Sequence, residues 1–157
     1  MIQSVNPAPT DETDGLPMPR RIWAVISVGF ALCMSVLDVN IINIVLPTLS
    51  HDFGTSPAVT TWIINGYQLA IVVSLLSFSA LGEIIGYRKV YLSGIGLFCI
   101  TSLICALSDS FWTLTIARIF QGFSASAITS VNTAQLRYIY PKSQLGRGMG
   151  INAMVVA

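Results

Sequence analysis

Charged side chains are scarce in this sequence: they make up 10% of its 157 residues, against about a quarter in an ordinary soluble domain. They are also unevenly spread, because residues 53–82, 90–108 and 119–136 contain none. Each of these gaps is long enough for a helix of about 20 residues, the length that crosses a ~30 Å hydrocarbon layer. With 54% hydrophobic residues and a mean hydropathy of +0.73, the composition excludes an ordinary soluble domain and indicates an integral membrane protein.

Other shortages argue against an enzyme and against cofactors. The sequence has one histidine, His51, and no paired carboxylates, so a membrane-embedded enzyme would lack convergent nucleophile, base or metal groups. The three cysteines, Cys33, Cys99 and Cys105, match no metal-ligand spacing, and we interpret them as small apolar packing residues. The formal net charge of +1 gives no sign of a nucleic-acid partner.

The pattern predicts an all-α integral membrane protein: a bundle of four transmembrane helices plus the start of a fifth. The expected helices cover about 22–47, 57–85, 90–107, 111–138 and 144–157, the last one incomplete. Pro47 is expected to close the first helix, and Trp62 and Tyr67 suit an interfacial aromatic belt. Residues 1–20 are expected to form a flexible cytoplasmic leader, and 21–157 the N-terminal transmembrane bundle.

The seven basic residues other than Arg118 predict the orientation, because they all fall on one side of this four-span arrangement. They are Arg20, Arg21, Arg88, Lys89, Arg137, Lys142 and Arg147. The opposite side has Asp52, Asp109 and His51, with no lysine or arginine. Since cytoplasmic loops of membrane proteins carry an excess of basic residues, the N-terminus is expected to be cytoplasmic.

Two charged residues are predicted to lie inside the membrane. Asp38 lies ~12 Å below the outer end of the first helix and Arg118 ~9 Å below that of the fourth, at 1.5 Å per residue. A pair between them, direct or through water or Asn43, would lower the cost of burying both charges. The pair could be a structural contact that fixes helix register. Alternatively, Asp38 gains and loses a proton, with Arg118 adjusting its proton affinity.

The fourth helix also carries a polar face. Gln121, Gly122 and Asn132 follow Arg118 at spacings that share one side of a helix, and lipid would penalise this side. With Asn43, these residues are candidates to line either a cavity or an interhelical seam, and the sequence leaves both alternatives open.

Three segments together resemble the major facilitator superfamily, and in particular its fourteen-helix drug:proton antiporter branch. Residues 37–47 look like the signature of the first helix, 80–89 resemble the loop 2–3 motif, and 114–125 resemble the motif of the fourth helix. The loop departs from the motif: Glu83 stands for the usual aspartate, and Ile84 replaces an arginine.

The resemblance implies a secondary active transporter in the cell (plasma or inner) membrane, exporting small amphiphilic compounds in exchange for protons and using no cofactor. It implies proton coupling at Asp38 with Arg118, and a conformational latch at Glu83, Gly86, Arg88 and Lys89. The implied partners are the substrate, protons, the lipid bilayer and a missing C-terminal half of the same protein. The alternative is a short multi-pass protein that acts through helix association at Gly122, Ser126, Gly146 and Gly150.

Overall fold

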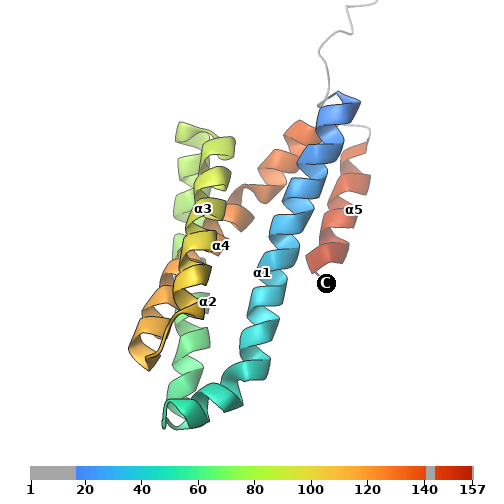
Figure 1. The fold of residues 1–157 in the computed structure, drawn as a ribbon. Coiled ribbons are helices and arrows are strands. Elements are labelled where there is room, and N and C mark those ends of the chain that lie inside the picture. The colour runs from blue at the N-terminus through green and yellow to red at the C-terminus, as the bar shows by residue number, and fades with distance from the viewer. Residues whose placement is uncertain (1–16, 141–143, 157) are drawn as a thin grey trace, which may run out of the picture.

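A computed structural model describes residues 17–140 and 144–156, and most of these belong to five helices. The helices are α1 (Met18–Asp52), α2 (Pro57–Ile85), α3 (Tyr87–Ala106), α4 (Phe111–Ile139) and α5 (Leu145–Val156). The described part of the chain contains no strand, and the expected all-α bundle is confirmed (Figure 1). Residues 1–16 of the expected leader lie outside the described residues, whereas 18–20 already belong to α1.

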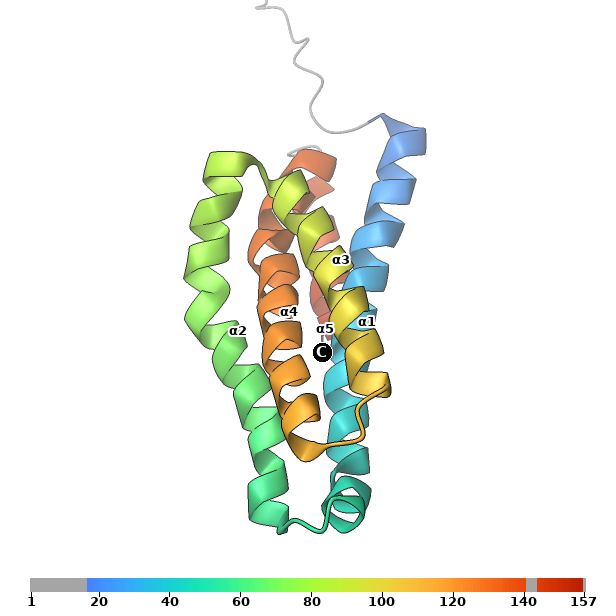
Figure 2. The same cartoon turned by 60° about the vertical axis from the view of Figure 1, so that its left-hand side comes forward.

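Helix α4 is the centre of the bundle. It packs along its length against α2 and α3 and lies between them (Figure 2), whereas α1 makes far fewer contacts with the other helices. Small residues make this close packing possible: a Cβ added to Gly94 of α3 would lie only 3.1 Å from the side chains of Ala127 and Ile128 of α4. Burial of Val90, Ile128 and Val131 fills the α3–α4 contact with apolar side chains.

Three of the described helices, α1, α2 and α3, are long and apolar enough to cross a membrane. The sequence predicted four such spans. Helix α4 is not among the three because it is less apolar, although it has 29 residues, as many as α2. The reason is that α4 buries polar side chains against its neighbours, among them Gln121, Ser124 and Ser126. In contrast, α2 exposes Val72 and Leu76 on its outer side, as expected for a surface in lipid.

Pro47 does not close α1, as the sequence had suggested, because the helix continues to Asp52. Proline has no N–H to donate to the carbonyl of Asn43 four residues earlier, and such a position kinks a helix rather than always ending it. The last turns of α1 bend toward the start of α2 (Figure 1). The third helix also begins earlier than expected, at Tyr87, because Gly86 alone makes the turn from α2.

Helix α5 packs on α1 and α4. Arg21 donates from Nη2 to Gln144 Oε1 over 2.5 Å, and its guanidinium lies 4.6 Å from the centre of the Tyr140 ring. Gly148 allows α5 to lie close to the Tyr140 ring, because a Cβ at this position would be only 2.6 Å from that ring. Gly146 and Gly150, which the sequence had suggested as packing residues, have open space beside them.

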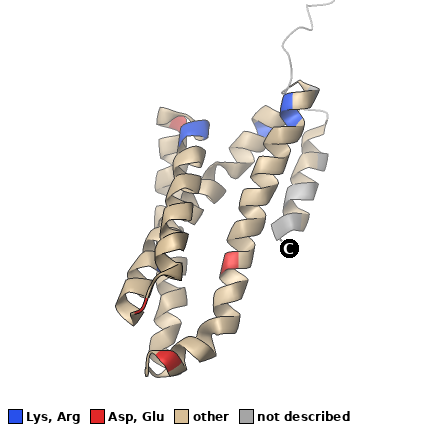
Figure 3. Ribbon diagram, in the orientation of Figure 1, with Lys and Arg blue, Asp and Glu red and all other residues tan. Residues whose placement is uncertain are grey.

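Basic residues are concentrated at one end of the bundle. The starts of α1 and α3 and the ends of α2 and α4 share this end, which holds Arg20, Arg21, Arg88, Lys89 and Arg137 together with one acidic residue, Glu83 (Figure 3). Asp52 and Asp109 lie at the opposite end, and Asp38 lies midway along α1. Lys142 lies outside the described residues, as does the side chain of Arg147.

Candidate functional site

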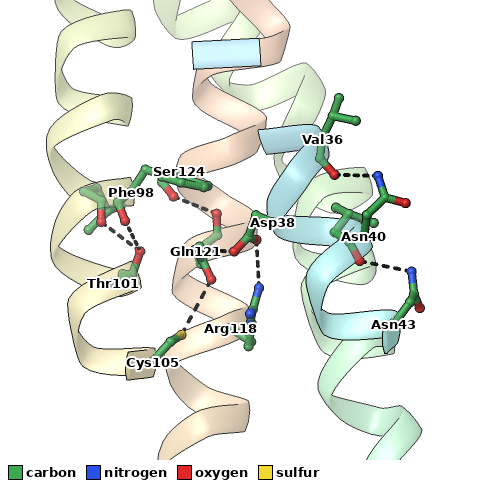
Figure 4. Close-up of polar contacts among 12 residues, drawn as sticks. Val36, Asp38, Asn40, Asn43, Phe98, Thr101, Cys105, Arg118, Gln121 and Ser124 are labelled. Atoms are coloured by element: carbon green, nitrogen blue, oxygen red, sulfur yellow. Dashed lines mark hydrogen bonds and ion pairs between the residues drawn. The ribbon is translucent and has the colours of Figure 1, made fainter. Parts of the chain in front are cut away.

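Asp38 and Arg118 are in direct contact across the boundary between α1 and α4 (Figure 4). Arg118 Nη1 donates to Asp38 Oδ2 over 2.7 Å. The side chain of Asp38 is only 14% exposed and that of Arg118 only 9%. A pair so enclosed is screened little by solvent, so each charge depends strongly on the other.

Gln121 completes the hydrogen bonding of the carboxylate. Its Nε2 donates to Asp38 Oδ1 over 3.2 Å, so both oxygens of Asp38 accept from α4. The other end of the same amide accepts from Cys105 on α3, with Sγ 3.6 Å from Gln121 Oε1. Gln121 is fully buried, and the Ser124 hydroxyl donates to its backbone carbonyl over 2.6 Å. Four residues therefore connect α1, α3 and α4 through one carboxylate (Figure 4).

The local sequence explains this geometry. Arg118 and Gln121 are three residues apart, so they share one face of α4 and reach the same partner. Gly122, which follows directly, lets α2 approach: a Cβ there would lie 2.5 Å from the carbonyl oxygen of Tyr67. Tyr67 is buried, and its hydroxyl group interacts electrostatically with both Asp38 and Arg118. All four long helices thus contribute to the surroundings of Asp38.

The guanidinium of Arg118 is not fully satisfied. Its Nε is buried and has no hydrogen-bond partner among the described residues. A buried donor without an acceptor costs about 1–3 kcal/mol, more when charged, so the arginine depends mainly on its bond to Asp38. Chemically, the site holds a carboxylate that can take up a proton, beside a cation that loses its counter-charge when this happens.

Asn43 does not take part in the pair. Its side chain is exposed, and its Nδ2 donates over 3.0 Å to the carbonyl of Val39 in its own helix. Figure 4 shows Asn43 directed away from Asp38 and Arg118. The suggestion that Asn43 bridges the pair is wrong for this structure, because an asparagine inside a helix can bond its own backbone instead.

The other polar residues of α4 lie in a seam between helices. Gln121, Gly122 and Asn132 are all buried, although Asn132 is fourteen residues beyond Arg118 and so ~21 Å away along the helix. Ser126 donates to the carbonyl of Ile71 on α2 over 3.2 Å. Of the two alternatives that the sequence left open, the described helices favour the seam for α4.

The predicted latch residues surround a one-residue turn at the basic end. Gly86 has φ +98° and ψ 132°, a backbone conformation that residues with a Cβ rarely adopt. The other three residues of the predicted latch are exposed: Glu83, Arg88 and Lys89. Within the described part of the chain, no salt bridge joins Glu83 to a basic residue.

Two residues at the site were not identified from the sequence. Tyr67 had been interpreted as an interfacial aromatic, and Cys105 as a packing residue. A signal for Tyr67 exists, because it shares a helix face with Ile63, Ala70 and Ser74, all buried. No spacing in the sequence points to Cys105, whose role follows only from the contact between α3 and α4.

Comparison with known proteins identifies the family. Residues 28–157 match the family model described as Major Facilitator Superfamily. The chain is 51% identical over 149 residues to the uncharacterized transporter YebQ of Escherichia coli, covering 95% of this chain and 33% of that protein.

Two further relatives have more specific names. The chain is 32% identical to the drug efflux pump JefA of Mycobacterium tuberculosis, covering 81% of this chain and 25% of JefA. It is also 32% identical to the tetracenomycin C resistance and export protein of Streptomyces glaucescens, covering 96% and 28%. The chain spans only about a quarter to a third of the length of these relatives. On the match of the family model and these identities, the chain belongs to the major facilitator superfamily of membrane transporters.

Proposed function

We propose that the complete protein is a proton-coupled exporter of small amphiphilic compounds. The observation that carries this proposal is the enclosed carboxylate of Asp38, bound on one oxygen by Arg118 and on the other by Gln121. Ionisable groups within membrane spans are costly and mark ion or proton pathways by default. The names of two relatives, a drug efflux pump and a tetracenomycin C resistance and export protein, support the direction and the class of cargo.

In this proposal, protonation of Asp38 loosens α1 from the rest of the bundle. A neutral carboxyl group attracts Arg118 less strongly, and α1 has few other contacts with α4. The best-packed part of the bundle, α2 with α3 and α4, stays intact while α1 shifts. Such a change of packing between two states is the kind of step that alternating access requires.

The proposal includes parts of the protein beyond this chain. The relatives are about three times as long as this chain, and transporters of this type are built from repeats with the substrate site between them. A C-terminal half would supply the second wall of that site. Glu83, Arg88 and Lys89 around Gly86 are exposed and form no salt bridge within the described part of the chain, so they are suited to latch onto it.

The orientation and location are also part of the proposal. We place the N-terminus and the basic end in the cytoplasm of a cell whose plasma (inner) membrane holds the protein. The gathering of Arg20, Arg21, Arg88, Lys89 and Arg137 at one end, opposite Asp52 and Asp109, supports this assignment.

The alternative, a short protein that acts through helix association, has less support. Gly122 and Ser126 are used inside the bundle, against Tyr67 and Ile71 of α2. Only Gly146 and Gly150 remain open for contact with another molecule.

The proposal is tested by Asp38→Asn in the full-length protein reconstituted in liposomes. We expect efflux of ethidium driven by an imposed pH gradient to be lost while insertion stays intact, with a lower thermal stability because Arg118 loses its counter-charge. Asp52→Asn is the matched control, because Asp52 is exposed at the end of α1, and it is expected to export at the parent rate. Gradient-driven export by Asp38→Asn at the parent rate would exclude Asp38 as the coupling group.

A further inference from the structure

The amide of Gln121 has one end on Asp38 and the other on Cys105. Its Nε2 lies 3.2 Å from Asp38 Oδ1, and its Oε1 lies 3.6 Å from Cys105 Sγ. Gln121 has no exposed surface, so water is not available to replace either partner. The orientation of the amide is therefore determined by these two neighbours.

Both neighbours favour the same orientation. An ionised carboxylate only accepts hydrogen bonds, so it requires the NH₂ end of the amide, and a thiol has one S–H to donate to the carbonyl end. Rotating the amide by half a turn would place its oxygen against the carboxylate oxygen of Asp38. It would also place the NH₂ against sulfur, which is a weak acceptor.

We propose that Cys105 is a positioning residue for Asp38: its thiol holds the Gln121 amide with the NH₂ end toward the carboxylate and so favours the ionised form. This proposal rests on the proposed function only in treating protonation of Asp38 as the coupling event. It assigns α3 a part in the site, whereas the other two cysteines, Cys33 and Cys99, are exposed on the outside of the described bundle.

The groups that interact with Asp38, directly, through Gln121 or through their charge, come from three helices. Arg118 and Gln121 belong to α4, Tyr67 to α2 and Cys105, through Gln121, to α3. Replacing Cys105 leaves the charges of this set unchanged and alters only the hydrogen bond to Gln121. A hydrogen-bond donor that binds the charged form of an acid favours that form. If the hydrogen bond from Gln121 to Asp38 is weakened, Asp38 therefore takes up its proton at a higher pH.

The test uses the full-length protein in lipid nanodiscs and infrared difference spectra recorded against pH. Subtracting the Asp38→Asn spectrum isolates the C=O stretch of protonated Asp38 from that of the other carboxyl groups. We expect Cys105→Ala and Cys105→Val to raise the midpoint pH by up to about one unit, the size of one modest hydrogen bond. Cys105→Ser keeps a donor and should restore the midpoint to within a few tenths of the parent. Cys99→Ala, on the exposed side of α3, should not move it.

The pair of Ala and Val variants separates positioning from packing. Alanine removes volume, valine roughly keeps it, and neither donates, so a positioning role predicts the same shift in both. A shift in Cys105→Ala that Cys105→Val abolishes would indicate packing alone and overturn the proposal, as would a serine variant that behaves like alanine or an unchanged midpoint in all three.

The infrared result also stands apart from the proposed function. If Asp38→Asn still exports ethidium under a pH gradient, proton coupling at Asp38 fails, but the midpoint shift still decides whether Cys105 positions Gln121. If coupling holds and the proposal is correct, the pH of half-maximal efflux should move in the same direction as the infrared midpoint in Cys105→Ala and return in Cys105→Ser.

Discussion

The backbone of Tyr67 lies directly over Gly122, so that a Cβ on Gly122 would be 2.5 Å from the Tyr67 carbonyl oxygen and 2.9 Å from the Cβ of Ala70. Two backbones meet at this point, and neither can move aside like a flexible side chain. Gln121 is the adjacent residue, so the distance between α2 and α4 also determines where the amide that binds Asp38 lies.

Gly122→Ala should destabilise the bundle by about 1–3 kcal/mol, the usual cost of overpacking a well-packed interior. The new methyl group has to push α2 away from α4, which also disturbs the contacts of Tyr67 and Gln121. Thermal unfolding in detergent measures the loss. Gly96→Ala is the matched control, since Gly96 lies within α3, is exposed and has nothing within 4 Å of an added Cβ. It should be neutral or slightly stabilising, and equal losses in both variants would contradict this account.

Arg118→Ala should destabilise the protein by about 3 kcal/mol or more, because it leaves the enclosed carboxylate of Asp38 without its cation. Adding Asp38→Asn to this variant should recover part of the loss, since the uncompensated charge is then gone. The double-mutant cycle, measured by unfolding in detergent, gives the coupling between the two residues. Strictly additive losses would show that the 2.7 Å contact contributes nothing to stability.

Much of this site could be predicted because charge in a membrane is so costly. Asp38 and Arg118 stand out in apolar runs, and helix rise alone places them at similar depth, although the sequence does not say whether they touch. The polar face of α4 follows from spacings of three and four residues. Its burial between α2 and α3 does not follow from the spacing, because a cavity and a seam require the same pattern.

What the sequence did not predict depends on local competition and on contacts between distant segments. The Asn43 side chain can form a hydrogen bond either with Asp38 or with the backbone of its own helix. The rotation of α1 in the bundle determines which bond forms, and here Asn43 donates to the carbonyl of Val39. Pro47 lies within α1 instead of ending it, and whether a helix continues past a proline depends on how the following turns pack. The contact of Cys105 with Gln121 joins residues 16 positions apart on two helices, and no spacing rule encodes it.

Gly86→Ala should cost about 1–3 kcal/mol through backbone strain alone. No atom lies within 4 Å of an added Cβ, but φ +98° with ψ 132° is unfavourable for any residue with a side chain. Either the α2–α3 turn rearranges or the variant is less stable, and thermal unfolding in detergent detects the loss. Gly150→Ala, in α5 with open space and no positive φ, is the control and should be neutral. An unchanged stability of Gly86→Ala would mean that the turn adopts another conformation at no cost.

The two ends of the bundle should differ in their accessibility from outside the cell. In a variant with Cys33→Ala, Cys99→Ala and Cys105→Ser, we expect His51→Cys to react with a membrane-impermeant maleimide added to intact cells. Lys89→Cys should react only after permeabilisation. Both parent side chains are exposed, so burial does not explain a difference between them. The expectation rests on the basic residues gathered at the end of the bundle that holds Lys89. Basic residues favour keeping that end on the cytoplasmic side of the membrane. The reverse pattern of labelling would place the N-terminus outside and would overturn the proposed orientation.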